Sequence, residues 1–290
     1  MFEGALTAIV TPFTENGEKI DEQALRRLVD FQIENGISGL VPVGTTGESP
    51  TLSHEEHREV IRIVVDQAAG RVPIIAGSGS NCTATAIELT GKAKEIGATA
   101  SLQVAPYYNK PTQEGFYRHF TAIADAVDLP IIVYNIPGRS GKNIENSTML
   151  KLTAHKNIVA VKEASGDIGQ MMDLIAKKPD DFTVLSGDDN LVFPLMALGG
   201  KGVISVAGNL VPRRMSDFVG ADLKGDWDRA KELHYQLLPL FKAIFIETNP
   251  IPIKAALAWQ GMIKETYRLP MCPLQPASRE ALKAILKEIL

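Results

Sequence analysis

The sequence predicts an α/β protein: a (β/α)8 TIM barrel followed by a C-terminal helical appendage. Over about 210 of its 290 residues, eight short runs rich in β-branched residues alternate with longer segments of helical period. Such alternation requires parallel strands joined by helical crossovers. Eight consecutive units fit a closed barrel better than a doubly wound sheet, which more often stops at about five or six strands.

The strands are expected where short apolar runs stand between turn residues. Their predicted ranges are 5–10, 39–43, 73–76, 100–104, 131–134, 158–161, 182–185 and 203–206. Between the first two, Leu25, Leu28 and Val29 recur at helical spacing. This helix is expected to begin at Asp21 and to end at Gly36, because an aspartate caps helix starts and a glycine favours helix ends.

The next helix opens with a capping box formed by Ser53 and Glu56, and Gly70 ends it. Further helical patterns cover residues 83–96, 113–127, 147–154, 168–177 and 190–198. After residue 210 no convincing strand follows, and helices are expected at 212–222, 226–245, 250–260 and 278–289. We therefore predict a barrel domain at 1–224, which carries the active site, and a C-terminal helical domain at 225–290.

Composition excludes several classes of function. The net charge is −4 and no basic run occurs, so the electrostatic footprint of a nucleic-acid-binding protein is missing. No apolar run approaches the about 18 residues of a membrane span, and the first residues lack the pattern of a signal peptide. Cys82 and Cys272 are far apart, which disfavours a disulfide scaffold. We expect a protein of the cytoplasm that binds neither membranes nor nucleic acids.

Metal and nucleotide motifs are not supported either. The histidines of His54-Glu-Glu-His57 are three residues apart, whereas a zincin helix needs a spacing of four. Residues 77–82 lack the third glycine of a dinucleotide fingerprint, and no P-loop pattern occurs. We therefore predict no metal and no cofactor.

Lys162 closes the apolar run 157–162, and an amine on a buried strand could form an imine. A lysine needs partial desolvation to be reactive at neutral pH, because burial lowers its pKa. Taken alone, such a lysine is more often a solvated strand end. In a barrel, however, reactive groups stand at the carboxyl ends of strands. Four predicted strands end in polar groups there: the turn 44–48, Tyr134 with Arg139, Lys162, and residues 187–189.

The order and spacing of five segments resemble the class I pyruvate-dependent aldolase family. These segments are 44–48 (GTTGE), 105–111 (APYYNKP), 134–141 (YNIPGRSG), 161–166 (VKEASG) and 247–254 (ETNPIPIK). The resemblance covers the whole chain. It implies that an imine with pyruvate forms, loses a proton to become an enamine, and attacks L-aspartate 4-semialdehyde in lysine and diaminopimelate biosynthesis.

The resemblance also implies a role for each matching residue. Lys162 would form the Schiff base with pyruvate, and Tyr134 would donate and accept protons. Thr45 and Tyr108 would complete the proton relay, with Tyr108 reaching across from a neighbouring subunit. For substrate binding, Thr46 would hold the carboxylate of pyruvate, the backbone at Ile204 and Gly187 would line the pocket, and Arg139 would hold the carboxylate of the second substrate.

The family further implies a homotetramer, a dimer of dimers, with a lysine feedback site. The residues that match this allosteric site are Ser49, His54, His57, Asn81, Tyr107 and Thr85. Thr85 stands where lysine-sensitive members carry a glutamate, and losing that charge-assisted hydrogen bond costs about 1.5 to 3 kcal/mol. We expect lysine to be a weak effector, unless Glu88, one helical turn further on, substitutes.

Two other readings stay open. One is a different pyruvate-dependent aldolase, acting on a keto-deoxy sugar acid or on sialic acid. Sialic-acid lyases share the lysine and the tyrosine but characteristically lack the arginine found here at position 139. The other is a barrel without catalytic activity that binds a metabolite. Loss of Lys162, Tyr134 or Thr45 would favour it, and all three are present.

Overall fold

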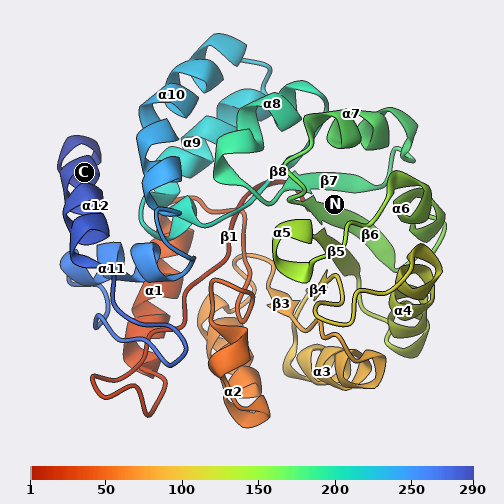
Figure 1. Ribbon diagram of the computed structural model, residues 1–290, viewed down its shortest axis with the longest axis horizontal. Helices are drawn as coiled ribbons and strands as arrows, with labels where there is room; N and C mark the ends of the chain where they lie inside the picture. Colours follow the sequence, from red (N-terminus) through yellow and green to blue (C-terminus); the bar gives the residue numbers. More distant parts are fainter. Residues whose placement is uncertain (1) are drawn as a thin grey trace.

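Eight parallel strands form the centre of the protein, which a computed structural model describes over residues 2–290 (Figure 1). The strands are β1 (Gly4–Thr7), β2 (Gly39–Leu40), β3 (Ile75–Gly77), β4 (Ala100–Val104), β5 (Ile131–Asn135), β6 (Ile158–Glu163), β7 (Thr183–Ser186) and β8 (Gly202–Ser205). They follow the order β2-β1-β8-β7-β6-β5-β4-β3, and a parallel bridge between Leu40 and Ile74 joins the two ends. The predicted (β/α)8 barrel is confirmed.

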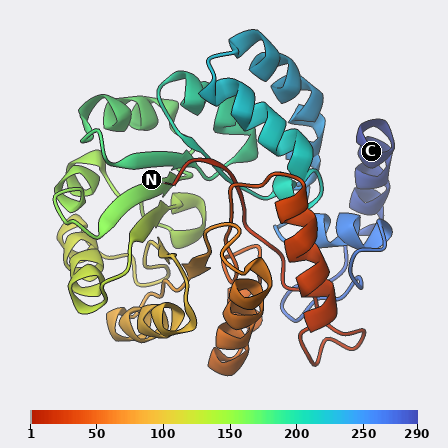
Figure 2. The same cartoon turned by 180° about the vertical axis from the view of Figure 1, so that it is seen from behind.

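Helices surround the strands and continue beyond the barrel (Figures 1 and 2). The α-helices are α1 (Glu22–Glu34), α2 (His54–Ala68), α3 (Thr83–Ile96), α4 (Gln113–Ala126), α5 (Pro137–Ser140), α6 (Asn146–Leu152), α7 (Ile168–Lys177), α8 (Val192–Ala197), α9 (Pro212–Leu223), α10 (Trp227–Ala243), α11 (Ile251–Trp259) and α12 (Pro276–Ile289). Short 3-10 turns occupy Ser49–Thr51, Asp189–Leu191 and Ala207–Asn209. The predicted capping box of α2 is present, with Ser53 and Glu56 bonding each other's backbone N–H.

Three predicted boundaries are wrong near the mouth of the barrel. Strand β1 ends at Thr7 instead of residue 10. Strand β2 ends at Leu40 instead of residue 43, because Val43 turns into the left-handed region with a φ of 51° and cannot continue the ladder. The helix predicted at 190–198 begins as a 3-10 turn at Asp189, and α8 proper starts at Val192. Strand β6 runs to Glu163, so Lys162 lies within the strand.

The C-terminal helices pack against one side of the barrel. Helix α10 contacts α9, and α12 contacts both α10 and α11. Figures 1 and 2 show the blue helices α11 and α12 beside the red helix α1. One apolar cluster includes Leu25 and Val64 of the barrel helices together with Leu237 and Leu282 of the C-terminal helices. We propose that residues 225–290 form an appendage whose core is continuous with that of the barrel.

No helix between residues 2 and 290 combines the length and the apolar character that a membrane crossing requires.

Candidate active site

Lys162 projects from β6 toward the neighbouring strand β5, where Tyr134 is its register partner. Only 6% of Lys162 is exposed, and its Nζ lies 4.2 Å from the centroid of the Tyr134 ring. Burial lowers the pKa of Lys162 to about 8, while the nearby carboxylates of Asp188 and Asp189 oppose that shift. About a tenth of the amine is therefore unprotonated at pH 7, far more than for an ordinary lysine, and this neutral form can act as a nucleophile.

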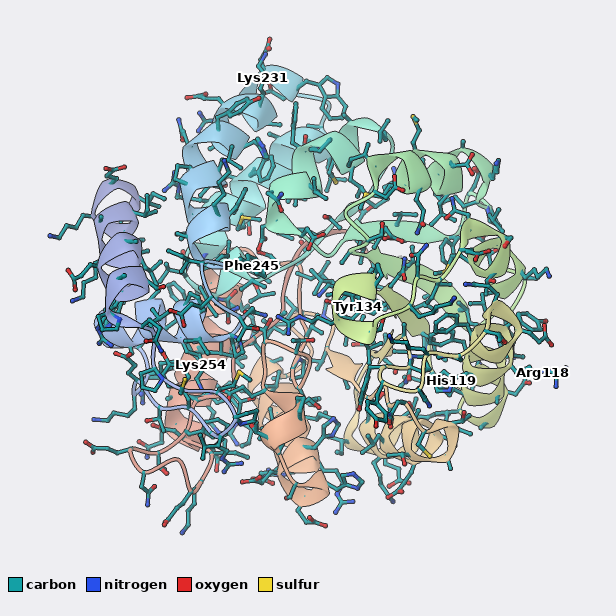
Figure 3. The ribbon with its side chains drawn as sticks, in the orientation of Figure 1. Arg118, His119, Tyr134, Lys231, Phe245 and Lys254 are labelled. Atoms are coloured by element: carbon teal, nitrogen blue, oxygen red, sulfur yellow. The ribbon has the colours of Figure 1, made fainter. Side chains whose placement is uncertain are left out.

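Lys162 opens into a cavity of about 450 Å³ at the carboxyl ends of the strands. Figure 3 shows Tyr134 near the centre of the ring of helices, beside α5. Six residues predicted to take part in catalysis or substrate binding line this cavity: Lys162, Tyr134, Thr45, Thr46, Arg139 and Gly187. Five residues of the predicted effector site line it too: Ser49, His54, His57, Thr85 and Tyr107. In the single chain the two predicted sites are thus continuous.

The turn after β2 presents two threonines to the cavity. Thr46 is buried, and its Oγ1 accepts a hydrogen bond of 2.9 Å from the Nδ2 of Asn249. The hydroxyl proton of Thr46 therefore stays available for an acceptor on a ligand. Gly47 lets the backbone pass close to its neighbours, since a Cβ there would lie 2.9 Å from the backbone nitrogen of Val43.

Tyr134 is 5% exposed, and burial raises the pKa of its phenol, with a further increase from the nearby carboxylate of Asp188. The hydroxyl is consequently protonated at neutral pH and can donate a hydrogen bond or a proton. Arg139 lies in the short helix α5, which begins directly after β5. Its Nη2 donates to the backbone oxygen of Asn249 at 3.3 Å, and Arg139 lines the cavity.

Gly187 keeps space open beside the amine. A Cβ at this position would lie 2.7 Å from the Cβ of Ala164 and 3.1 Å from the Cε of Lys162. Both distances are shorter than normal carbon contacts. The absence of a side chain at Gly187 thus leaves space beside Cε of Lys162.

Three predicted residues lie outside the cavity lining. Tyr108 is 91% exposed and adopts a φ of 69°, so its side chain stands away from Lys162 in the same chain. Ile204 is fully buried in the inner layer of the barrel, and Val206, two residues further on, lines the cavity instead. Asn81 donates from its Nδ2 to the backbone oxygen of Tyr107 at 3.2 Å.

Two residues that sequence reasoning gave no role also reach the cavity. Asp188 follows Gly187, and burial raises the pKa of its carboxyl to about 6, although Lys162 opposes that shift. Asn249 approaches from the C-terminal segment and contacts Thr46 and Arg139. An acidic pair after the seventh strand was visible in the sequence. The position of Asn249 was not, because it is 203 residues from its partner Thr46.

Asp189, next to Asp188, serves the scaffold. Its carboxylate is fully buried and accepts from the Oγ of Ser205 at 2.5 Å and from the backbone N–H groups of Val206 and Ala207 at 3.0 and 3.1 Å. These bonds tie the loop after β7 to the loop after β8. Among residues 2–290, no three His, Cys, Asp or Glu side chains gather closely enough to hold a metal ion.

A buried amine with a lowered pKa, in a cavity at the carboxyl ends of the strands of a (β/α)8 barrel, is the arrangement of the imine-forming aldolase class. Comparison with known proteins identifies the family within this class. The chain belongs to the dihydrodipicolinate synthetase family, whose family model matches residues 1–289.

Relatives match the chain over nearly its whole length. The 4-hydroxy-tetrahydrodipicolinate synthase of Trichlorobacter lovleyi is 54% identical over 99% of both chains. Among solved structures, the corresponding synthase of Methylacidiphilum fumariolicum has a TM-score of 0.98 at 49% identity, covering 100% of this chain and 96% of the other. The enzyme of Cyanidioschyzon merolae, solved with lysine bound, has a TM-score of 0.97 at 40% identity, covering 100% and 99%.

Proposed function

We propose that Lys162 carries the pyruvate imine in the reaction that defines the family. The enzyme condenses pyruvate with L-aspartate 4-semialdehyde to give 4-hydroxy-tetrahydrodipicolinate, a step of lysine and diaminopimelate biosynthesis. The observation that carries the assignment is the buried amine of Lys162, with its lowered pKa, against the Tyr134 ring. The expected compartment is the cytoplasm.

The chemistry needs no bound cofactor, because the imine itself withdraws electrons. The neutral amine of Lys162 attacks the ketone carbon of pyruvate, and water leaves. The protonated imine makes the neighbouring methyl group acidic, so that a proton leaves and an enamine forms. The enamine carbon then attacks the aldehyde of the semialdehyde. The amino group of the adduct finally displaces the amine of Lys162, which closes the ring and frees the enzyme.

Proton transfer is assigned to Tyr134, with Thr45 and Tyr108 completing the relay. Tyr134 is supported by its buried, protonated phenol, whose ring centroid lies 4.2 Å from the amine. Thr45 lines the same cavity. Tyr108 is 91% exposed in the single chain, which suits a side chain that enters the cavity of a neighbouring subunit. This role requires an oligomer, and we propose a homotetramer built as a dimer of dimers.

The two carboxylates of the substrates are assigned to different sides of the cavity. The free hydroxyl proton of Thr46 suits the carboxylate of pyruvate, with Gly187 and the backbone near Ile204 leaving space. The guanidinium of Arg139, exposed at the rim, suits the carboxylate of the semialdehyde. The half-buried carboxyl of Asp188 lines the same space and would balance the charge of a protonated imine.

The proposed reaction is tested by coupling turnover to a dihydrodipicolinate reductase. Pyruvate is supplied with L-aspartate 4-semialdehyde in one series and with sugar aldehydes in another. We expect turnover only with the semialdehyde. Equal or faster consumption of pyruvate with a sugar aldehyde would instead support the sugar-acid aldolase. If no aldehyde were consumed, the barrel that binds a metabolite without catalysis would be favoured.

Imine formation should depend on pH through the amine of Lys162. Because its pKa is lowered to about 8, the reactive neutral fraction should rise about tenfold per pH unit below 8 and level off above it. The initial rate of borohydride-trapped labelling by limiting pyruvate, measured between about pH 6 and 9.5, gives this profile. A midpoint near 10.5, the value of an ordinary lysine, would contradict the assignment.

Substitution of Arg139 should separate the two substrates. Arg139→Ala removes charge-assisted hydrogen bonds worth about 1.5 to 3 kcal/mol, so the KM for the semialdehyde should rise about 10- to 100-fold. Pyruvate labelling of Lys162 should be unchanged. Lys142→Ala, which removes an exposed cation three residues away and outside the cavity lining, is the matched control. An equal rise of both KM values would place Arg139 elsewhere in the mechanism.

Lysine is proposed as a weak effector at the part of the cavity that Ser49, His54, His57, Thr85 and Tyr107 line. Asn81 supports this part by bonding the backbone of Tyr107. The lysine-bound Cyanidioschyzon merolae relative supports an effector role for this amino acid. Thr85 supplies no carboxylate for the ammonium group of the ligand.

Lysine near its physiological concentration should therefore inhibit the wild-type enzyme little, and Thr85→Glu should lower the half-inhibitory concentration about tenfold or more. An inhibition titration with both proteins measures this. Potent inhibition of the wild-type enzyme by lysine would contradict the prediction. Glu88→Gln is the companion variant, because a loss of inhibition in it would show that Glu88 replaces the missing carboxylate.

A further inference from the structure

Three side chains of the C-terminal segment converge on the turn that carries Thr46. Asn249 donates to the Thr46 hydroxyl, and Lys254 forms an ion pair with Glu48. Arg268 donates to the backbone oxygen of Thr51 at 3.1 Å, and its Nη2 lies 2.6 Å from Oε1 of Glu56. The C-terminal helices thus hold residues 46–56 at three successive points, although they contribute little surface to the cavity itself.

The central point of this contact is a fully buried ion pair. The side chains of Lys254 and Glu48 are 0% and 1% exposed, and Nζ of Lys254 bonds to Oε1 of Glu48. On its other sides the ammonium group meets aromatic faces, at 4.3 Å from the ring centroid of Phe13 and 5.5 Å from that of Tyr267. Lys254 does not line the cavity, so it is no second imine-forming lysine. Figure 3 shows Lys254 where the blue C-terminal ribbon meets the red N-terminal ribbon.

Burial of this pair is hard to explain by stability alone. Desolvating two charges offsets most of their attraction, and a well-packed apolar pair of similar volume is often as stable or more so. The second carboxylate oxygen of Glu48, Oε2, has no hydrogen-bond partner in the described part of the chain. Because the pair adds little net stability, we explain its burial by control of the local backbone geometry.

The backbone of Glu48 adopts an unusual conformation, which the ion pair with Lys254 can hold in place. Glu48 adopts a φ of 55° and a ψ of 35°, in the left-handed region that costs a residue with a side chain about 1 kcal/mol or more. It lies two residues after Thr46 and directly before the 3-10 turn Ser49–Thr51. Its N–H bonds the backbone oxygen of Thr45 at 3.1 Å. A change in the backbone at Glu48 is therefore transmitted to both threonines of the turn.

We propose that Glu48 and Lys254 are positioning residues for the carboxylate site of pyruvate: the buried pair locks the turn so that the hydroxyl of Thr46 points at the first substrate. This role rests on the proposed function, in which Thr46 binds that carboxylate. The pair acts on one substrate only. Arg139, at the site of the second substrate, is carried by α5, and its contact with the C-terminal segment is a hydrogen bond to the backbone oxygen of Asn249 rather than to the buried pair.

The test measures the two substrates separately in Lys254→Met, Glu48→Gln and the double variant. The pyruvate concentration that gives half-maximal borohydride labelling should rise about tenfold or more in each, while the KM for the semialdehyde stays within about twofold. Arg279→Met is the matched control. It breaks the Arg279–Glu265 ion pair, which lies wholly inside the C-terminal segment at 2.7 Å, and it should leave both values unchanged.

Folding is monitored by circular dichroism and thermal melting. The single variants leave one buried charge unpaired, whereas the double variant leaves none and should recover stability while its pyruvate affinity stays low. Wild-type pyruvate labelling in a folded single or double variant would overturn the proposal. A loss of affinity for both substrates, in proportion to the loss of folded protein, would also overturn it. A wild-type chain that pyruvate does not label overturns the proposed function itself, and the two failures are thereby distinguished.

Discussion

Replacement of Lys162 by methionine should lower turnover by at least about 10³-fold and remove pyruvate-dependent borohydride labelling altogether. Methionine keeps the length and the apolar stem of the side chain, so the β6 strand and its contacts with Tyr134 and Leu185 should persist. Only the amine that forms the imine is lost. Mass mapping of labelled wild-type peptides should find the adduct on Lys162.

The matched control for this variant is Lys201→Met. Lys201 is exposed, and it directly precedes β8, at the end of the strand opposite the cavity. We expect wild-type turnover and labelling in this control. An adduct mapped to any other lysine, including the buried Lys254, would contradict the central assignment, as would labelling that survives in the Lys162→Met protein.

Replacement of Tyr134 by phenylalanine should reduce kcat by about 10²- to 10⁴-fold, the range for loss of a general acid or base. The ring remains, so its contact with the Lys162 amine at 4.2 Å and the packing of the inner barrel layer should be kept. The imine should still be trapped, but more slowly, because proton delivery is impaired. Stopped-flow and steady-state measurements with both substrates separate imine formation from overall turnover.

Tyr117→Phe serves as the control for the loss of a tyrosine hydroxyl. Tyr117 lies in α4, packs against the apolar core and does not line the cavity. Its kcat should match the wild type. If the Tyr134→Phe protein turned over at more than about a tenth of the wild-type rate, proton transfer would have to be reassigned to other groups. Thr45 and the Tyr108 of a neighbouring subunit would then be examined first.

Local sequence patterns predicted three elements to the residue. The ranges 83–96, 100–104 and 168–177 agree with α3, β4 and α7. Each has a clear signal, because α3 ends at Gly97 in the left-handed region and the Asp167 side chain caps α7. Strand β2 was overestimated because Val41 and Val43 are apolar and β-branched, as in a strand. Pro42 between them has no N–H for the ladder, and Val43 turns into the left-handed region.

Eleven residues of the cavity lining were also predicted from the sequence as site residues. In a barrel the carboxyl ends of all strands meet at one mouth, so knowing the strands was enough to bring Thr45, Thr46, Tyr134, Arg139 and Lys162 together. The electrostatic environment of these side chains could not be predicted from the sequence. The pKa of Lys162, about 8, is lowered by burial against the opposing effect of Asp188 and Asp189, and burial is a property of the packed barrel.

The sequence by itself determined the alternation of strands and helices, the lysine on the sixth strand and the family to which the motifs belong. These are properties of local order and spacing, which short-range preferences encode. Only the tertiary structure decided that Asn249 bonds Thr46 and that Lys254 pairs with Glu48, across 203 and 206 residues. No local pattern in either segment shows that these distant residues meet. They exist because the C-terminal helices bury their apolar faces against the barrel and bring these side chains to its mouth.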